Sequence, residues 1–207
     1  FYTVRRIVAG HVWAYLAALL WVLNPVQVFF ESRLLLDSLF ASGVVWLIYL
    51  VLIAKEEKKY YFVTGIVLGL LAILRPTALV FVPVIIAFLW GGRKSAILKL
   101  IVGIILPIIP VTLSNLANGD FVLIASQGGI NFYIGNNPKS DGSSAVVPEF
   151  GWNWRYSQCV RLAEKNVGRE LKPSQVSRYY FKKGLKFIIS NPLPAIKLYI
   201  KKLALLI

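Results

Sequence analysis

Long apolar runs separated by short charged stretches make up the first half of the chain. Their length and composition predict helices that cross a membrane over residues 8–30, 34–54 and 100–117. A further apolar run begins at residue 60 and ends at residue 90, and it is interrupted only by Arg75-Pro76.

The run over residues 60–90 is too long for one membrane-spanning helix. As a single helix it would be about 46 Å long, whereas the hydrocarbon core is about 30 Å thick. Pro76 removes a backbone donor and disfavours helical geometry at Arg75. We therefore predict two short antiparallel helices, 60–74 and 77–90, whose connecting turn lies below the outer membrane surface.

Three basic clusters give an independent prediction of topology. They lie at Arg5-Arg6, in the stretch 55–59 and at Arg93-Lys94. With two short helices, all three clusters fall on the cytoplasmic side, as the positive-inside rule expects. A single kinked helix would place the last cluster outside, so the charges favour two helices.

Residues 118–191 form a polar segment of roughly 75 residues, which the same topology places on the extracytoplasmic side. Within it we predict a short strand over Phe121–Ala125, turns over 127–144, and a helix over Trp154–Val167 that Gly168 ends. Residues 192–207 are predicted to begin another span. The expected fold is mainly α: a polytopic transmembrane helix bundle (residues 1–117) with a small mixed α/β extracytoplasmic segment.

The stretch Ser177–Ile189 within this segment is amphipathic at helical spacing. Two interpretations stay open: a helix at the membrane interface over anionic headgroups, or a helix packed on its own domain. The apolar face comprises Phe181, Leu185, Ile188 and Ile189, and the basic face Arg178, Lys182 and Lys186.

Composition supports a membrane protein, with the plasma membrane as its expected location. The chain is 57% hydrophobic and only 15% charged, whereas soluble domains contain about 25% charged residues. The net charge is +14, and the basic residues lie between apolar blocks rather than along a groove. No nucleic-acid partner is therefore predicted. Because the chain lacks Met and its last residue, Ile207, lies within an apolar run, we interpret it as an internal piece of a longer protein.

Two turns predicted on the outer face contain charged residues. Arg33 and Asp37 are four residues apart and share one helix face, with Asp37 about one turn inside the membrane. A charge at that depth normally faces a protein interior or a cavity with a partner. Arg75 lies in the other turn, and arginine suits bidentate phosphate binding. The alternatives are an Arg33–Asp37 pair that only anchors its helix, and an Arg75 that only pairs with a lipid headgroup or Asp37.

Further along, Asn131, Tyr133, Asn136 and Asn137 are candidates for a polar lip that binds substrate, although ordinary turn chemistry explains the asparagines equally well. His11 is the sole histidine, so no zinc site is predicted. No phosphate-binding loop or metal-ligand spacing is present, and no cofactor is indicated. The sequence leaves open whether a divalent metal joins a bound phosphate.

Several motifs together resemble one enzyme family. The run Glu31-Ser-Arg-Leu-Leu-Leu-Asp37 resembles the (S/A)R-x-x-x-(D/E) segment of polytopic glycosyltransferases that use polyprenyl-phosphate sugars. These are the protein O-mannosyltransferases and aminoarabinose transferase-like enzymes, with the C-type glycosyltransferase fold. The stretch 65–76 looks like their G-x-x-x-G-L-x-x-L-(T)-(R/K) signature, and 128–138 is similar to the opening of their soluble region. Asn191-Pro192 resembles the return into the membrane.

The resemblance implies transfer of a sugar from a polyprenyl-phosphate donor to a protein, lipid or glycan on the outer face. Asp37 and Arg33 would then belong to the catalytic site, and Arg75 would bind the donor phosphate. The family's catalytic base lies upstream of every residue in this chain, so the chain alone is expected to be inactive.

Two other classes remain open. A transporter or flippase of polyprenyl-linked saccharides also needs buried cations and broken helices, but such proteins usually contain inverted repeats, and none is found here. A non-catalytic membrane scaffold would use the polar segment as an interaction module. A scaffold role does not explain why Arg75 would lie below the membrane surface.

Overall fold

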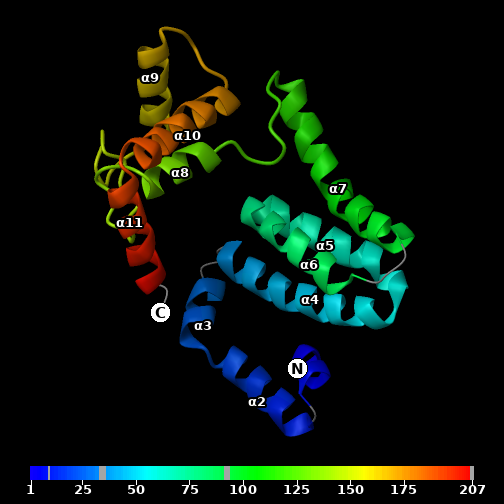
Figure 1. The fold of residues 1–207 in the computed structure, drawn as a ribbon. Coiled ribbons are helices and arrows are strands. Elements are labelled where there is room, and N and C mark those ends of the chain that lie inside the picture. The colour runs from blue at the N-terminus through cyan, green and yellow to red at the C-terminus, as the bar shows by residue number, and fades with distance from the viewer. Residues whose placement is uncertain (9, 33–35, 91–93, 206–207) are drawn as a thin grey trace. The chain divides into compact units, whose positions relative to one another are not determined.

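The computed structural model describes residues 1–8, 10–32, 36–90 and 94–205, and these are mainly helical with no β-strand. The chain divides into two compact units, which we call unit 1 (Phe1–Ser114) and unit 2 (Asn115–Ile207) (Figure 1). The boundary lies close to the predicted start of the polar segment at residue 118.

Unit 1 begins with three short helices, α1 (Tyr2–Ile7), α2 (His11–Val22) and α3 (Pro25–Ser32). The prediction of one helix over 8–30 is therefore wrong. Gly10 has a φ of 122°, which is not helical, and Pro25 begins a new helix. Asn24 stabilises this start, because its side-chain oxygen accepts a hydrogen bond from the Val26 N–H at 3.0 Å.

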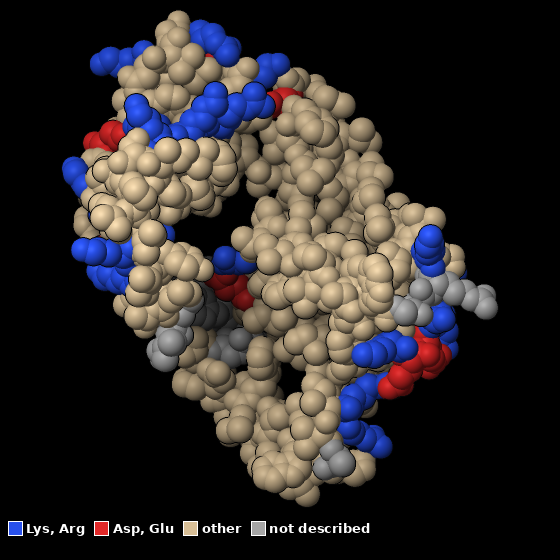
Figure 2. Space-filling view, viewed as in Figure 1, with Lys and Arg blue, Asp and Glu red and all other residues tan. Residues whose placement is uncertain are grey.

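Two longer helices in unit 1 are long and apolar enough to cross a membrane: α4 (Leu36–Glu56) and α7 (Lys94–Ala117). Only 17% and 28% of their most apolar windows are buried, so the described residues leave most of this apolar surface uncovered. On the face that Figure 2 shows, charged side chains are sparse on unit 1. The exposed apolar side chains of α4 and α7 need another apolar environment, which a lipid bilayer would supply.

Short helices connect these two: η1 (Lys58–Tyr60), α5 (Tyr61–Leu74), η2 (Pro76–Val80) and α6 (Phe81–Phe88). The break between α5 and η2 lies where the sequence predicts it. Arg75 has extended backbone (φ −143°, ψ 108°), which suits a residue before proline, and Pro76 starts the next helix.

Glycines let α5 and α7 approach until their backbones touch. A Cβ on Gly65 would overlap the carbonyl oxygen of Leu100, and a Cβ on Gly103 would overlap that of Phe62. At Gly69 the added atom would lie 2.8 Å from Cγ of Pro107. The Gly-x-x-x-Gly pattern of α5 therefore has a packing role, as small residues do between membrane helices.

Unit 2 contains α8 (Gly128–Gly135), α9 (Tyr156–Val167), α10 (Pro173–Ser190) and α11 (Pro192–Ala204). Tyr180 of α10 is fully buried, and its hydroxyl donates a hydrogen bond to the Cys159 carbonyl at 2.9 Å. The core of this unit consists of Ile130, Tyr133, Val147, Cys159, Ala163, Val176 and Tyr180.

The predicted strand over 121–125 is wrong, since these residues have no regular structure. The side-chain amide of Asn115 donates to the Val122 carbonyl at 2.9 Å, so a side chain replaces the partner that a strand would supply. The described part of unit 2 is helical rather than mixed α/β. The predicted end of α9 agrees with the structure, because Gly168 adopts a left-handed φ of 78°.

Candidate functional site

Arg75 and Asp37 form an ion pair in unit 1. The pair joins the break between α5 and η2 to the first turn of α4. The two side chains are 49% and 46% exposed, so the pair lies at the surface of unit 1 and is open to a ligand. Arg33, the third predicted member of this site, lies outside the described residues.

An aromatic ring also contacts this arginine. The guanidinium carbon of Arg75 lies 6.0 Å from the centre of the Phe40 ring, which is within cation–π range. Phe40 follows Asp37 by three residues, so the two side chains lie on neighbouring positions of one helix face. One turn of α4 therefore supplies an ion pair and an aromatic contact to the guanidinium.

An apolar groove of about 270 Å³ runs between α4 and α6. Its lining contains no polar side chain. The lining residues are Val44, Leu47, Ile48, Val51, Leu52, Phe81, Val84, Ile85 and Phe88.

The groove and the ion pair share one face of α4. Val44, Ile48 and Val51 follow Asp37 by seven, eleven and fourteen residues, which is the spacing of one helix face. Asp37 therefore lies about 10 Å along the axis from the first groove residue. On the opposite wall, η2 leads from Arg75 directly into α6. The ion pair and the apolar groove therefore lie on one face of α4, at different heights along its axis.

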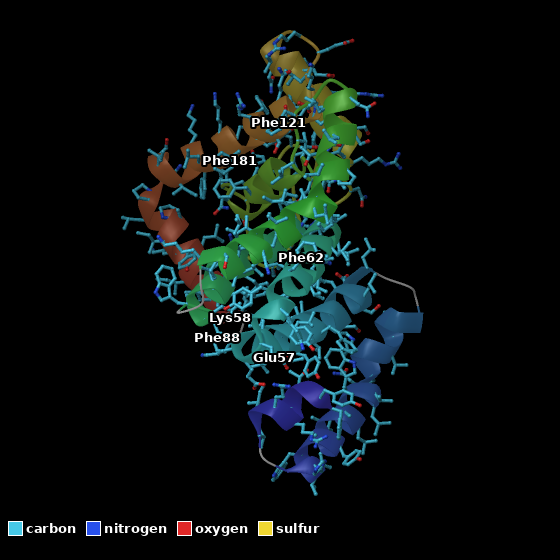
Figure 3. All side chains as sticks on the ribbon, turned by 90° about the vertical axis from the view of Figure 1, so that its right-hand side faces the viewer. Glu57, Lys58, Phe62, Phe88, Phe121 and Phe181 are labelled. Atoms are coloured by element: carbon cyan, nitrogen blue, oxygen red, sulfur yellow. The ribbon has the colours of Figure 1, made fainter. Side chains whose placement is uncertain are left out.

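The other end of α4 has its own charged contacts. Arg6 pairs with Glu56 at 2.5 Å, and Nζ of Lys55 lies 4.0 Å from the centre of the Phe88 ring. Figure 3 shows Phe88 at the same end of unit 1 as Glu57 and Lys58. The Arg6–Glu56 ion pair thus joins α1 to the end of α4 that is remote from Asp37, and Arg75 can be compared with it.

The four residues predicted to form a substrate lip do not share one exposed surface. Asn131 is exposed and Asn136 is half-buried, whereas Tyr133 and Asn137 are buried. The Asn137 side-chain nitrogen donates to the carbonyls of Tyr133 and Ile134, each at 2.9 Å, and its oxygen accepts from the Lys139 N–H at 2.8 Å. These bonds close the end of α8, so the fold itself explains this asparagine.

A cluster that sequence reasoning missed lies in unit 2. Glu149 accepts hydrogen bonds from Lys183 at 2.5 Å and from the Tyr133 hydroxyl at 3.1 Å. The Lys183 ammonium also lies 4.9 Å from the centre of the Tyr133 ring. The three residues are remote in sequence and form no motif. The one available signal is that Lys183 lies off the basic face that Arg178 and its neighbours define.

Mutual contacts shift the pKa values of this cluster. Burial by itself would raise the pKa of Glu149, but hydrogen bonds from Lys183 and Tyr133 hold it below its usual value. Burial opposes the charged form of Lys183, yet contact with Glu149 outweighs it and raises that pKa. Burial also raises the pKa of Tyr133 to about 12, so its hydroxyl stays protonated and donates. Through Glu149 the cluster links α8 to α10 within unit 2.

We expect Glu149→Gln to destabilise unit 2 by about 1–2 kcal/mol at neutral pH, because it replaces a charged acceptor of Lys183. The lowered folded-state pKa means that this stability is present above the unfolded pKa of about 4.3 and is lost in acid. The sole cysteine, Cys159, is fully buried, so its labelling rate reports opening of unit 2.

With a disulfide reagent that reacts in acid, Glu149→Gln should label about tenfold faster than wild type at neutral pH. The two rates should converge as the pH falls through the lowered folded-state pKa of Glu149. Glu170→Gln, at an exposed position of the same unit, is the control and should behave as wild type. Equal labelling of Glu149→Gln and wild type at neutral pH would show that the cluster does not stabilise unit 2.

The described residues contain no group of three or more His, Cys, Asp or Glu side chains that could hold a metal ion. Comparisons of the chain with protein families, with characterised proteins and with solved structures find no match.

Proposed function

We propose that this chain belongs to a membrane enzyme that transfers a sugar from a polyprenyl-phosphate donor to a protein, lipid or glycan. The observation that carries the proposal is the Arg75–Asp37 pair on the same face of α4 as an apolar groove. A polyprenyl phosphate has the matching parts, since one anionic group is joined to a long apolar chain.

Arg75 is suited to the phosphate. A guanidinium has five N–H donors in a planar fork, and its Nη2 contacts a carboxylate oxygen of Asp37. Asp37 thereby orients the guanidinium while leaving the half-exposed fork accessible to a second anion. Hydrogen bonds between arginine and phosphate are charge-assisted, which makes them shorter and stronger than neutral ones.

The groove is suited to the polyprenyl chain. Burying apolar surface is favourable by roughly 25 cal/mol per Å², and a wholly apolar lining imposes no desolvation cost on polar groups. The groove opens at the surface of unit 1, so a chain longer than the groove would continue among the surrounding lipid tails.

The proposed membrane arrangement follows from the helices. Helices α4 and α7 would cross the bilayer, and the short helices α5 and α6 would hold the Arg75 turn below the outer surface. Non-helical backbone at such a depth requires a protein or aqueous environment, which the site provides. Unit 2 would lie on the extracytoplasmic side and receive the acceptor.

Binding tests the site directly. We expect the chain, reconstituted in lipid nanodiscs, to bind polyprenyl phosphate at least about tenfold more tightly than polyprenol, which has the same tail without the charge. Arg75→Ala should remove this preference. Arg6→Ala should keep it, because Arg6 pairs with Glu56 at the other end of α4. Equal affinity of the wild-type chain for both ligands would contradict the proposed phosphate site.

A further inference from the structure

Helix α10 has an apolar surface that the rest of unit 2 leaves uncovered. Phe181, Leu185 and Ile189 are 46%, 40% and 70% exposed, and they follow one another at intervals of four residues. We call these three residues the apolar stripe. The centre of the Phe181 ring lies 4.7 Å from that of Phe132, and almost half of the Phe181 surface is still exposed.

A different face of α10 packs on unit 2. Val176, Tyr180 and Gly184 are buried and also recur every four residues. At 100° per residue this packed face is turned by about 100° from Phe181. The sequence alone left open whether the apolar residues of this helix face its own domain. The contacts show that the core uses the packed face, so the apolar stripe is available for another partner.

A basic row lies next to the apolar stripe. Arg178, Lys182 and Lys186 are exposed, recur at the same interval, and form no ion pair with the residues that the structure describes. The sequence contains no acidic residue after Glu170. Figure 2 shows many blue basic side chains and few red acidic ones on unit 2. The exposed side of α10 therefore has an apolar stripe and, next to it, a row of positive charge.

Helix α11 has the same character. Leu193, Ile196 and Ile200 are 71%, 55% and 59% exposed. Lys197 and Lys201 are exposed beside them. Apolar side chains flanked by lysines therefore continue beyond the end of α10.

We infer that α10 lies on an anionic lipid surface, with the apolar stripe inserted at the headgroup boundary and the basic row against lipid phosphates. An amphipathic helix with a basic polar face binds in this way, by apolar burial together with attraction to anionic lipids. A nucleic acid would match the basic row but would leave the apolar stripe in water. A second copy of this chain would bring two basic rows together. Neither the inference nor its test depends on sugar transfer.

Environment-sensitive fluorescence tests the inference in the full chain. An NBD probe on Ile189→Cys is compared in nanodiscs of phosphatidylcholine and in nanodiscs that also contain phosphatidylglycerol, after discs that carry the chain are isolated. The native Cys159 is fully buried and should not take up the probe. We expect NBD emission to rise several-fold and shift to the blue in the anionic discs, and high salt should reverse the change.

Charge reversal supplies the matched comparison. Lys182→Glu/Lys186→Glu should abolish the anionic-lipid response. Arg161→Glu/Lys165→Glu, an exposed basic pair at the same spacing on α9, should keep it. Equal emission in the two kinds of disc would overturn the inference. So would a bright signal that survives reversal of Lys182 and Lys186 and rises with the number of chains per disc, since that result assigns the stripe to a second copy.

Discussion

Gly65→Ala is expected to unfold unit 1 at a clearly lower denaturant concentration than the wild-type chain. The new methyl group would overlap the Leu100 carbonyl oxygen, and this oxygen belongs to a helix backbone that cannot move alone. The helices α5 and α7 would have to separate. Overpacking costs about 1–3 kcal/mol, so the loss should exceed the gain of about 1 kcal/mol that alanine brings to a helix. Gly65→Leu should cost more.

Gly43→Ala is the matched control, because it adds the same methyl group to another helix of unit 1. There the nearest atom is Cδ2 of Leu71, at 2.5 Å, which is the end of a side chain that can rotate away. Titration of the detergent-solubilised chain with SDS, followed by circular dichroism, gives the midpoints. We expect a lower midpoint for Gly65→Ala and an equal or higher one for Gly43→Ala, which keeps the gain in helix propensity. Equal midpoints for the two variants would show that the close approach of α5 and α7 contributes little stability.

Local chemistry explains which elements the sequence predicts well. The break at Arg75-Pro76 follows from the proline ring, which restricts its own backbone and that of the residue before it. The end of α9 at Gly168 follows from the freedom of glycine to adopt a left-handed conformation. The ion pair of Arg75 with Asp37 agrees with the expected convergence of the two turns, and it is also the contact that the alternative of simple charge pairing expects.

Tertiary contacts explain what the sequence does not predict. Gly128-Gly129 predicts a turn, yet both residues lie in α8. A Cβ on Gly129 would overlap the Ser177 carbonyl oxygen, so glycine serves the packing of α8 on α10. The Gly129 N–H also donates to the Ser177 hydroxyl oxygen at 3.0 Å. The sequence near residue 129 predicts neither contact.

The sequence predicts the charged residues of the candidate site but not its apolar groove. Charge and depth single out Asp37 and Arg75, because an ionised residue within apolar runs needs a partner. The apolar groove has no such signal, since valine, leucine and phenylalanine occur throughout these helices. Its lining emerges only when α4 and α6 are placed side by side.

Arg75→Ala is expected to have the largest effect on the proposed reaction. In sugar transfer the acceptor oxygen forms a bond to the anomeric carbon, the bond from that carbon to the phosphate oxygen breaks, and the electron pair stays on the phosphate. The acceptor proton passes to a general base. Because negative charge on the leaving phosphate grows in the transition state, the Arg75 guanidinium should stabilise that state more than the bound donor.

Loss of one such group costs roughly 10²–10³ in rate in well-studied enzymes. Arg75→Lys should recover only part of the rate, since an ammonium keeps the charge but lacks the planar fork. Asp37→Asn should also slow transfer, because the guanidinium loses the charged partner that orients it. Arg6→Ala removes an ion pair from the opposite end of α4 and should leave the rate unchanged.

The most direct measurement is the rate of sugar transfer from a polyprenyl-phosphate sugar by the full-length protein in membranes, with wild type, Arg75→Ala and Arg6→Ala at matched expression. Phosphate stabilisation by Arg75 predicts transfer at least about a hundredfold slower in Arg75→Ala and unchanged in Arg6→Ala. Transfer by Arg75→Ala at the wild-type rate would contradict the proposed role of Arg75 in the reaction.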